Sequence, residues 1–327
     1  MFKLPGSDNL AQEANATKCE TFTALTWNCE GIKNSIFLLK DILSNAKISF
    51  VCLSEPQLYQ CDTSQVFQYL QGEYCCQLNS HDSQDPELPM IRSRAIGGTL
   101  IMWLRELDPY IEVISTNTTA FLPIIFEKPG LQTSVHISLY MPTHSKDSEF
   151  VSDLAELRNC LDELVARYTD LVLYIRGDGN VNSNTTMRVA LLRQLISDYN
   201  LVQTVTGHNT YHHFVGNGMY DSDIDILLHS SDDNVEEAVT KIMCKLDNPD
   251  ILSHHDVILS SFTIPTKEDI PLSPLNIVAP KIEHTRTRID WSETGQLEYC
   301  NLVAPYLRQV REQWLDAHSQ QSMSIRA

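Results

Sequence analysis

Polar residues suited to phosphate chemistry recur in this sequence at the ends of short apolar runs. The stretch "TWNCEG" carries Asn28 and Glu30, and the stretch "VCLSEPQL" carries Glu55. The later candidates, in chain order, are Tyr140, Asp178, Asn180, Ser222, Asp223, Asp225, His254, His255 and Asp256. Strand ends and the loops that follow them are where α/β folds place their active sites. The pattern therefore predicts one site that is assembled from several strand ends.

The residue types in this set suit cleavage of a phosphodiester with one divalent cation. Mg²⁺ is usually held by one or two carboxylates, so Glu55 with help from Asn28 would suffice, and Mn²⁺ is the alternative ion. Asp178 could orient or deprotonate the attacking water. Asn180 and Tyr140 would donate hydrogen bonds to phosphate oxygens on which charge develops. Any one of these residues also fits an ordinary turn, so the combination carries the prediction.

The elements that must position these residues alternate between strands and helices. Apolar, β-rich runs predict strands at residues 21–27, 48–55, 97–104, 133–141, 171–178, 222–229 and 256–265. Helical spacing of apolar residues is found at 34–46, 150–168 and 187–200. Many strands are nearly continuous apolar runs, which indicates sheets that are covered by helices. We therefore expect an α/β fold with more strands than a small Rossmann unit.

Composition limits the classes of function. The chain has 327 residues, of which 43% are hydrophobic, and a formal net charge of −18. Phosphate binding normally draws on a basic face, so an acidic chain needs a metal ion to supply positive charge. No stretch approaches the roughly 20 apolar residues of a membrane helix, and the N-terminus has no apolar signal region. We therefore expect an intracellular protein.

Cysteine and histidine usage gives no metal-binding motif at the level of spacing. The nine cysteines are an odd number without a CxxC pair, which favours buried or free thiols in a reducing compartment. The adjacent pair His212 and His213 is interpreted as two strand residues rather than as ligands.

Three segments are expected along the chain. Residues 1–20 are predicted to be a disordered leader, 21–266 the catalytic domain, and 267–327 a linker with an amphipathic helix. In that helix one face carries Leu302, Tyr306, Val310 and Trp314 at intervals of four residues. Within the domain, residues 77–95 are predicted to be a surface loop, 229–250 to contain a solvated acidic segment, and 210–223 to form a hairpin with a "GNG" turn.

Six blocks of the sequence, in this order, resemble a known superfamily. The blocks are "WNCEG", "LSEPQL", "LYMP", "RGDGNVN", "NTYHHF" with "SDIDILL", and "LSHHDV". They resemble the endonuclease/exonuclease/phosphatase superfamily, which includes DNase I, abasic-site endonucleases, inositol-polyphosphate phosphatases and the endonuclease domains of LINE-type retrotransposons. The resemblance implies a DNase I-like fold, which is a four-layer α/β sandwich of two packed sheets flanked by helices.

The same resemblance implies roles for the residues in each block. In the first four blocks, the residues Asn28, Glu55, Tyr140, Asp178 and Asn180 take the roles described above. Glu55 is implied as the metal ligand. In the later blocks Thr210 and Ser222 are implied as supporting residues, and Asp225 as a structural residue or one on the DNA side. The closing block is implied to supply an Asp-His dyad.

Two positions depart from the pattern of the superfamily. Gly179 stands where an aromatic residue is usual, which predicts a loss of packing or loop rigidity. In the closing block, His254 stands where the aspartate of the dyad belongs. An aspartate normally fixes the tautomer of the imidazole and stabilises its charged form, so we expect weaker catalysis unless another acid reaches His255.

Two arrangements of the closing block remain open. Asp256 is the obvious substitute acid, but on an extended strand it would face away from His255. His254 and Asp256 would then share a face, which allows a second arrangement with His254 catalytic and Asp256 as its orienting acid. A turn or bulge at these residues would change that parity.

The tail "RIDWSETGQLEYCNLVAPYLRQVREQW" resembles the segment between the endonuclease and the reverse transcriptase of some animal non-LTR retrotransposons. This implies a Mg²⁺-dependent DNA endonuclease that nicks target DNA for retrotransposition. DNA would be its substrate, a reverse transcriptase region would follow the chain, and its location would be nuclear at least transiently. Two alternatives are a phosphatase of the same superfamily and a weak or inactive descendant that serves as a binding module. Few cationic candidates for a phosphate site are visible, namely Arg92, Arg94 and Arg176.

Overall fold

The computed structural model describes most of the predicted catalytic domain. It covers residues 19–267 apart from Tyr69, Gln71, 84–88, 90–94, His144, 183–185, Asn217 and Asp233. The first strand begins at Cys19, inside the predicted leader. The rest of that leader, Arg92, Arg94 and the predicted C-terminal helix lie outside the described residues. Among the described residues, no helix has the length and apolarity to span a membrane.

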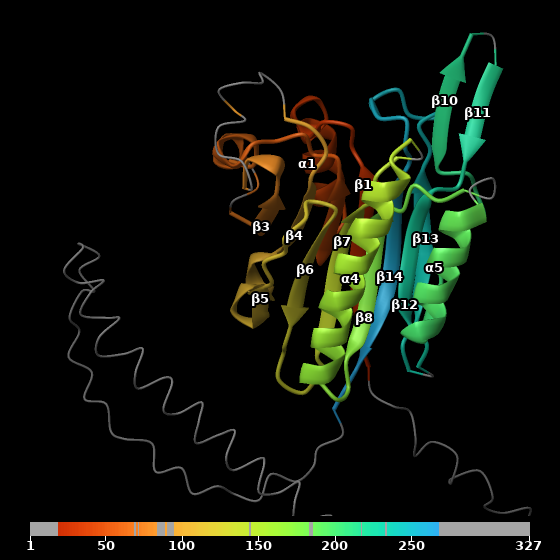
Figure 1. Ribbon diagram of the computed structural model, residues 1–327. Coiled ribbons are helices and arrows are strands. Elements are labelled where there is room, and N and C mark those ends of the chain that lie inside the picture. Colours follow the sequence, from red (N-terminus) through yellow and green to blue (C-terminus); the bar gives the residue numbers. More distant parts are fainter. Residues whose placement is uncertain are drawn as a thin grey trace, which may run out of the picture. The chain divides into compact units, whose positions relative to one another are not determined.

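Two six-stranded sheets form the centre of the fold (Figure 1). The first has the order β13-β14-β1-β2-β4-β3, built from β1 (Cys19–Asn28), β2 (Phe50–Ser54), β3 (Tyr74–Asn79), β4 (Thr99–Leu104), β13 (Glu237–Met243) and β14 (Val257–Pro265). The second has the order β5-β6-β7-β8-β12-β9, built from β5 (Ile111–Val113), β6 (Phe121–Phe126), β7 (Ser134–Tyr140), β8 (Val172–Asp178), β9 (Leu201–Gln203) and β12 (Asp225–Ser230). In each sheet two central strands, β1 with β2 and β7 with β8, run parallel.

Helices cover the outer face of each sheet, which gives four layers (Figure 1). The α-helices are α1 (Ile36–Asn45), α2 (Thr63–Val66), α4 (Asp147–Arg167) and α5 (Thr186–Asp198). Short 3₁₀ turns lie at η1 (Ile32–Asn34), η2 (Gln60–Asp62), η3 (His81–Ser83) and η4 (Arg105–Tyr110). In α4 the buried residues recur at helical intervals on the face towards the second sheet, as the periodicity predicts: Phe150, Leu154, Leu157, Leu161 and Leu164. The predicted four-layer α/β sandwich is confirmed.

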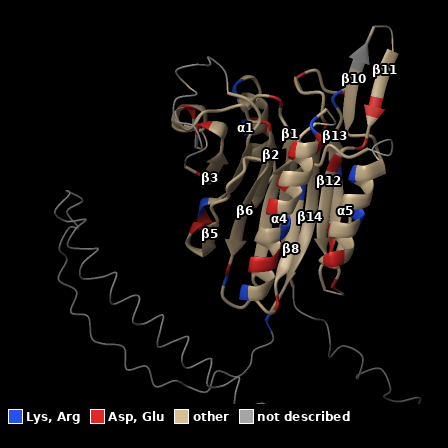
Figure 2. Ribbon diagram, viewed as in Figure 1, with Lys and Arg blue, Asp and Glu red and all other residues tan. Residues whose placement is uncertain are grey.

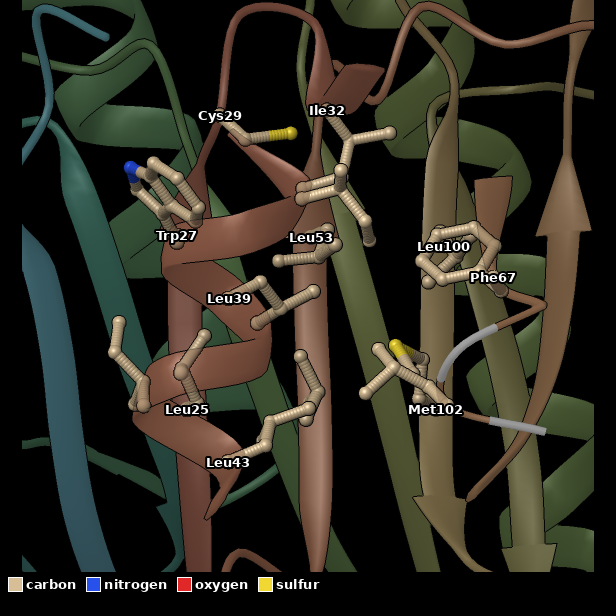
Figure 3. Close-up of a cluster of buried hydrophobic side chains, with 14 of the residues drawn as sticks. Leu25, Trp27, Cys29, Ile32, Leu39, Leu43, Leu53, Phe67, Leu100 and Met102 are labelled. Atoms are coloured by element: carbon tan, nitrogen blue, oxygen red, sulfur yellow. The ribbon is translucent and has the colours of Figure 1, made fainter. Parts of the chain in front are cut away.

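The core has an aliphatic part under α1 and an aromatic part between the sheets. Figure 3 shows the first, where Leu39 and Leu43 of α1 pack on Leu25, Leu53 and Met102 of the sheet. The second contains four phenylalanines, Phe22, Phe50, Phe126 and Phe262, whose rings lie 5.5–6.2 Å apart. Contacts of this kind fix the two sheets face to face.

Several elements differ from, or add to, the sequence-based expectation, and no predicted run covers β5, β6, β9 or α2. The acidic stretch predicted to be solvated contains strand β13, and Glu237 in it is buried. The predicted surface loop begins later than expected, because Gln77 to Asn79 belong to β3. The predicted hairpin is confirmed as β10 (Tyr211–Val215) and β11 (Gly218–Ser222), which project from one end of the sandwich (Figure 1).

Glu237 is buried because it holds a charged group between the sheets. The Arg176 side chain from β8 is fully buried, and its Nε donates to Glu237 Oε1 of β13 over 2.7 Å. Arg176 Nη1 also lies 3.2 Å from Nδ1 of His136, whose ring stacks on Phe50. Burial, followed by the Arg176 charge, lowers the pKa of His136 well below its usual range, so the ring is neutral and Nδ1 accepts. This network joins the two sheets and occupies Arg176, a residue that the sequence offered for phosphate binding.

We expect Glu237→Gln to lower the free energy of unfolding by about 3–5 kcal/mol, because it leaves the Arg176 charge buried without a counter-charge. The matched control is Glu106→Gln, which breaks the exposed pair of Lys47 and Glu106 and should cost less than about 1 kcal/mol. Urea unfolding followed by circular dichroism measures both. Equal costs for the two variants would contradict the role given to Glu237.

Candidate active site

The parallel strand pairs of both sheets end at the same edge of the sandwich, and hydrogen bonds join them there. Ser54, the last residue of β2, donates its hydroxyl to the Leu139 carbonyl over 2.7 Å and accepts from the Asp178 N–H over 3.2 Å. Asn28, the last residue of β1, donates from Nδ2 to Asp178 Oδ2 over 2.9 Å and to Glu55 Oε1 over 3.3 Å. Asn28 thus brings together two predicted site carboxylates from different sheets.

The backbone around this edge is strained. Among the described residues, five residues other than glycine have positive φ, and four of them, Glu30, Glu55, Gln57 and Asn180, follow directly on β1, β2 or β8. Such conformations cost on the order of 1–3 kcal/mol each and cluster at functional sites. The loop with Glu55 is held by backbone bonds, because the N–H groups of Glu55 and Gln57 donate to Gly98 and Gly97.

The block "GDGN" forms a tight turn that positions Asp178. The Asn180 N–H donates to Asp178 Oδ1 over 2.8 Å, and Asn180 Nδ2 donates to the Met141 carbonyl over 2.8 Å. At Gly179 an added Cβ would lie only 3.1 Å from Ile226. The Ile226 side chain therefore packs against Gly179, while the predicted loss of packing or loop rigidity stays a prediction.

Tyr140 lies against the acidic groups of the site. Its hydroxyl is hydrogen bonded to the Glu55 carboxylate, and burial followed by the charge of Glu55 raises the pKa of Tyr140 far above its usual range. The carboxylates of Asp178 and Glu30 raise it further. The hydroxyl therefore keeps its proton and can donate a hydrogen bond.

His255 has an orienting acid, and that acid is Asp225. His255 Nδ1 lies 2.9 Å from Asp225 Oδ2, and His255 Nε2 lies 3.8 Å from Asp178 Oδ2. Thr210 Oγ1 donates to Asp225 Oδ2 over 2.6 Å, and the Thr210 N–H donates to the Ser222 carbonyl over 3.1 Å. Thr210 and Ser222 thus support the pair, as the resemblance implies. Another acid thus reaches His255, and it is the second aspartate of "SDID" rather than Asp256.

The second arrangement of the closing block is not formed. His254 Nδ1 lies 2.8 Å from Glu30 Oε2, and the His254 N–H donates to the same oxygen over 2.9 Å. Asp256 points elsewhere, with Oδ1 accepting from the Lys245 N–H over 2.7 Å. His254 and Asp256 do not share a strand face, because β14 begins only at Val257 and residues 253–256 are not an extended strand. Sequence reasoning placed Glu30 at the first strand end but gave it no role.

Ser253 fixes the start of this segment. Its hydroxyl donates to the Asn28 carbonyl over 2.5 Å and accepts from the His255 N–H over 3.0 Å. The backbone that carries His255 is therefore attached to the end of β1, beside Glu55 and Asp178. The structure thus brings together the candidates Asn28, Glu55, Tyr140, Asp178, Asn180, Thr210, Ser222, Asp225, His254 and His255, whereas Asp256 bonds away from them.

Burial and charge set the protonation of the central groups. Burial raises the pKa of Asp178 to about 7, although the charge of His255 partly offsets this. Burial lowers the pKa of His255, but the Asp225 carboxylate outweighs that effect and the pKa rises to about 9. Near neutral pH the site therefore holds an imidazolium between Asp225 and Asp178.

The donor set fits a hard divalent cation. Glu55, Glu30 and Asp178 all act on the Tyr140 hydroxyl, so three carboxylates face one small region. Carboxylate oxygens are the ligands that Mg²⁺ and Mn²⁺ prefer. Asn28 Oδ1 accepts from the Glu30 N–H over 3.2 Å, while its Nδ2 bonds Glu55 and Asp178. Asn28 therefore hydrogen bonds with all three of these acidic residues.

The architecture defines the class of protein. The two packed sheets, the outer helices and the joined strand ends are those of a DNase I-like sandwich, the fold of the endonuclease/exonuclease/phosphatase superfamily. No family model and no curated protein matches the chain by sequence.

Particular solved structures share this fold at low identity. The endonuclease domain of TRAS1, a telomere-specific non-LTR retrotransposon, has a TM-score of 0.53 and 14% identity, covering 76% of this chain and 100% of that one. The AP endonuclease LMAP from Leishmania major has a TM-score of 0.56 and 13% identity, covering 76% and 88%. ANGEL2, a 2′,3′-cyclic phosphatase, has a TM-score of 0.53 and 11% identity, covering 75% and 95%. These similarities show the fold, and they span more than one chemistry.

We expect His255 in the metal-free chain to titrate near pH 9, and Asp225→Asn to lower its pKa, because Asp225 is the largest of the charges that raise it against the effect of burial. Because the pKa of His255 is higher in the folded than in the unfolded chain, its protonation stabilises the folded state. This stabilisation is fully present below about pH 6.5 and is lost as the pH rises through about 9. The stability difference between wild type and Asp225→Asn should therefore shrink across that window. NMR titration of the histidine side chains and urea unfolding at several pH values measure the two effects.

The matched control for this titration is Asp256→Asn, because Asp256 is equally buried and adjacent in sequence but bonds Lys245. In this variant the pKa of His255 should stay near that of wild type. A wild-type His255 that titrates near 6.5, or the same drop in both variants, would contradict the assigned pair.

Proposed function

We propose that this chain is a metal-dependent phosphodiesterase that nicks DNA. The observation that carries the proposal is the buried His255, oriented by Asp225 and directed at Asp178, beside a carboxylate cluster that fits a divalent cation. Mg²⁺ is the proposed ion, with Mn²⁺ as the alternative, and Glu55 is its proposed main ligand. When bound, the cation supplies positive charge to the phosphate and stabilises the charge that develops on its oxygens.

The residues of the chain would divide the remaining work. Asp178 orients the attacking water and accepts its proton as the new bond from water oxygen to phosphorus forms and the bond to the leaving oxygen breaks. The His255 imidazolium and an N–H of Asn180 donate towards the phosphate oxygens, where preorganised donors are most effective. The Tyr140 hydroxyl would join them by turning its proton from Glu55 to the phosphate. Asp225 holds His255 in the tautomer and charge state that this requires.

The retrotransposon assignment is the finer part of the proposal. It is supported by the fold shared with the TRAS1 endonuclease domain and by the resemblance of the tail to a linker that precedes reverse transcriptase. In this proposal the substrate is chromosomal DNA, a reverse transcriptase region acts with the chain, and the location is nuclear at least transiently.

A phosphatase of the same superfamily is the second candidate. Lys and Arg occur in Figure 2 as separate short stretches of the described ribbon rather than as one continuous band. A small phosphorylated substrate needs no such band, and ANGEL2 shows that the fold accommodates a phosphatase. The third alternative, an inactive descendant, is favoured by the altered closing block and by the net charge of −18. Asp225 removes the first of these grounds because it reaches His255.

We expect the chain to nick supercoiled plasmid in the presence of Mg²⁺, and Asp178→Asn and His255→Ala to lower the rate by about 10²–10⁴-fold, because each removes a group that moves or holds a proton. Glu55→Gln should remove the Mg²⁺-dependent activity. Agarose gels of initial nicking rates, with Mg²⁺ varied, measure all three. His254→Ala should be less damaging than His255→Ala, since His254 is half-exposed and bonds Glu30.

Glu163→Gln on the outer face of α4 is the control and should leave nicking unchanged. Release of phosphate from a small substrate with plasmid intact would favour the phosphatase instead. A folded wild-type chain that turns over neither substrate would contradict catalysis and favour a binding module.

The β10–β11 hairpin is the proposed element that probes DNA. Figure 1 shows it projecting from the sandwich, and Met219 and Tyr220 on it are 45% and 44% exposed. His213 and Tyr211 at its base contact the His254 and His255 rings, so the hairpin adjoins the site. Exposed aromatic and thioether groups there could stack on bases.

Tyr220→Ala should change the distribution of cleavage positions on a linear DNA while total cleavage falls less than about tenfold, because base stacking is worth about 1–3 kcal/mol and biases choice among sites. Sequencing of the nicked ends measures the distribution. Tyr168→Ala, at the far end of α4, is the aromatic control. An unchanged distribution in Tyr220→Ala, with folding intact, would contradict a probing role.

A further inference from the structure

A second cluster of ligand-type side chains lies beside the catalytic cluster and is separate from it. His212 comes from β10, Cys244 directly follows β13, and Asp256 directly precedes β14. One ligand atom from each lies within 4.8 Å of the others. His212 and Asp256 are buried and Cys244 is partly exposed. Three separate segments thus place an imidazole, a thiol and a carboxylate around one point.

The imidazole of His212 is oriented as a metal ligand would be. His212 Nδ1 lies 2.8 Å from Asp221 Oδ1, and Nε2 lies 3.3 Å from Asp256 Oδ2. When Nδ1 carries the proton and donates to Asp221, Nε2 presents a lone pair to a carboxylate oxygen. In that tautomer a cation bound between the two atoms would replace their mutual repulsion with two favourable contacts. A carboxylate on the outer nitrogen is also the usual partner of a metal-bound histidine.

The separations fit a small tetrahedral ion. Tetrahedral Zn²⁺ binds N and O at about 2.0–2.2 Å and S at about 2.3 Å, which places N and O about 3.3 Å apart and N and S about 3.6 Å apart. The observed separations are 3.3 Å from His212 Nε2 to Asp256 Oδ2 and 4.0 Å from Nε2 to Cys244 Sγ. The first separation matches the tetrahedral value and the second exceeds it by about 0.4 Å.

Asp256 is held in a position that leaves one oxygen for this point. Its Oδ1 accepts from the Lys245 N–H over 2.7 Å, and its own N–H donates to the Thr210 carbonyl over 2.8 Å. The His212 N–H donates to the His254 carbonyl over 2.8 Å. The backbone bonds therefore fix two of the three ligands before any ion binds.

We propose that His212, Cys244 and Asp256 form a Zn²⁺ site, with water as the fourth ligand and Asp221 orienting His212. A thiolate and an imidazole select Zn²⁺ over Mg²⁺. On binding, the Cys244 thiol gives its proton to solvent, so one thiolate and one carboxylate balance the two charges of the ion. The ion joins β10, β13 and the segment 253–256, and thereby fixes the backbone that carries His255. His212 is a strand residue of β10, as predicted, and the proposal gives it a ligand role in addition.

This inference is independent of nicking activity and is tested without substrate. The full chain carries Glu55→Gln, so that the catalytic cluster does not contribute. Co²⁺ is titrated into it, followed by Zn²⁺, and the sulfur-to-cobalt charge-transfer absorption in the near ultraviolet is recorded. We expect one equivalent of Co²⁺ to produce this band, Zn²⁺ to remove it, and Zn²⁺ to raise the melting temperature.

Variants assign the band to these residues. Cys244→Ser should abolish it and weaken Zn²⁺ binding by more than 100-fold, and Asp221→Asn should weaken binding about 10–100-fold, as loss of an outer partner of a metal-bound histidine does. Cys160→Ser, a partly exposed cysteine of α4, is the matched control and should leave band and affinity unchanged. Absence of the band in a folded wild-type chain, or an equal band in Cys244→Ser, would overturn the proposal and leave His212 with only its contacts to Asp221 and Asp256.

Discussion

The catalytic end of this fold depends on one imidazole placed between two buried carboxylates. His255, Asp225 and Asp178 are each less than 5% exposed, and withdrawing such charges from water costs several kcal/mol per ion. The cost is offset only where each remaining lone pair and proton has a partner. The partners here are the Thr210 hydroxyl on Asp225 and the Asn28 amide on Asp178. Supporting residues far apart in the sequence are thus consequences of one electrostatic requirement.

The strained strand ends are a second consequence of the same requirement. Glu30, Glu55 and Asn180 take left-handed backbone conformations directly after strands from both sheets, which turns their polar groups into one small volume. These conformations persist because neighbouring loops hold them, as the Glu55 N–H bond to Gly98 does. The buried ion pair of Arg176 and Glu237 holds the two sheets together, because it connects β8 of one sheet to β13 of the other. The strained conformations of the site persist because the surrounding scaffold is rigid.

Local patterns in the sequence were sufficient for the fold and for the membership of the site. Apolar runs and helical spacing predicted β1, β2, β4, β7, β8, β12 and β14 and the helices α1, α4 and α5. Strand β6 was missed although all six of its residues are buried. Strand β13 was missed because "EAVTKIM" mixes charged, polar and apolar residues at a sheet edge and so has the composition of a loop. The pairing of His255 with Asp225 was missed for another reason. It joins residues that are 30 apart, and no spacing rule tells which acid reaches a given ring.

The contacts of the segment 253–256 could not be predicted from the sequence. Ser253 bonds the end of β1, His254 bonds Glu30, His255 bonds Asp225, and Asp256 turns to His212. Four consecutive side chains reach four different elements, which neither a strand nor a helix of regular geometry allows. A one-residue error in alignment therefore changes every partner.

The acidic residues of the chain are distributed unevenly over the fold. Helix α4, on the outer face of the second sheet, carries six acidic and two basic residues, so a polyanion is repelled from that side. The proposed cations would lie away from this acidic helix, at the strand ends where Glu55, Glu30 and the base of the hairpin meet. In the proposed nuclease the field would therefore guide a polyanion to the strand ends, although the net charge of −18 opposes binding elsewhere. Affinity for DNA would then depend on bound metal more steeply than on salt-sensitive contacts with lysine and arginine, because so little of the phosphate neutralisation would come from side chains.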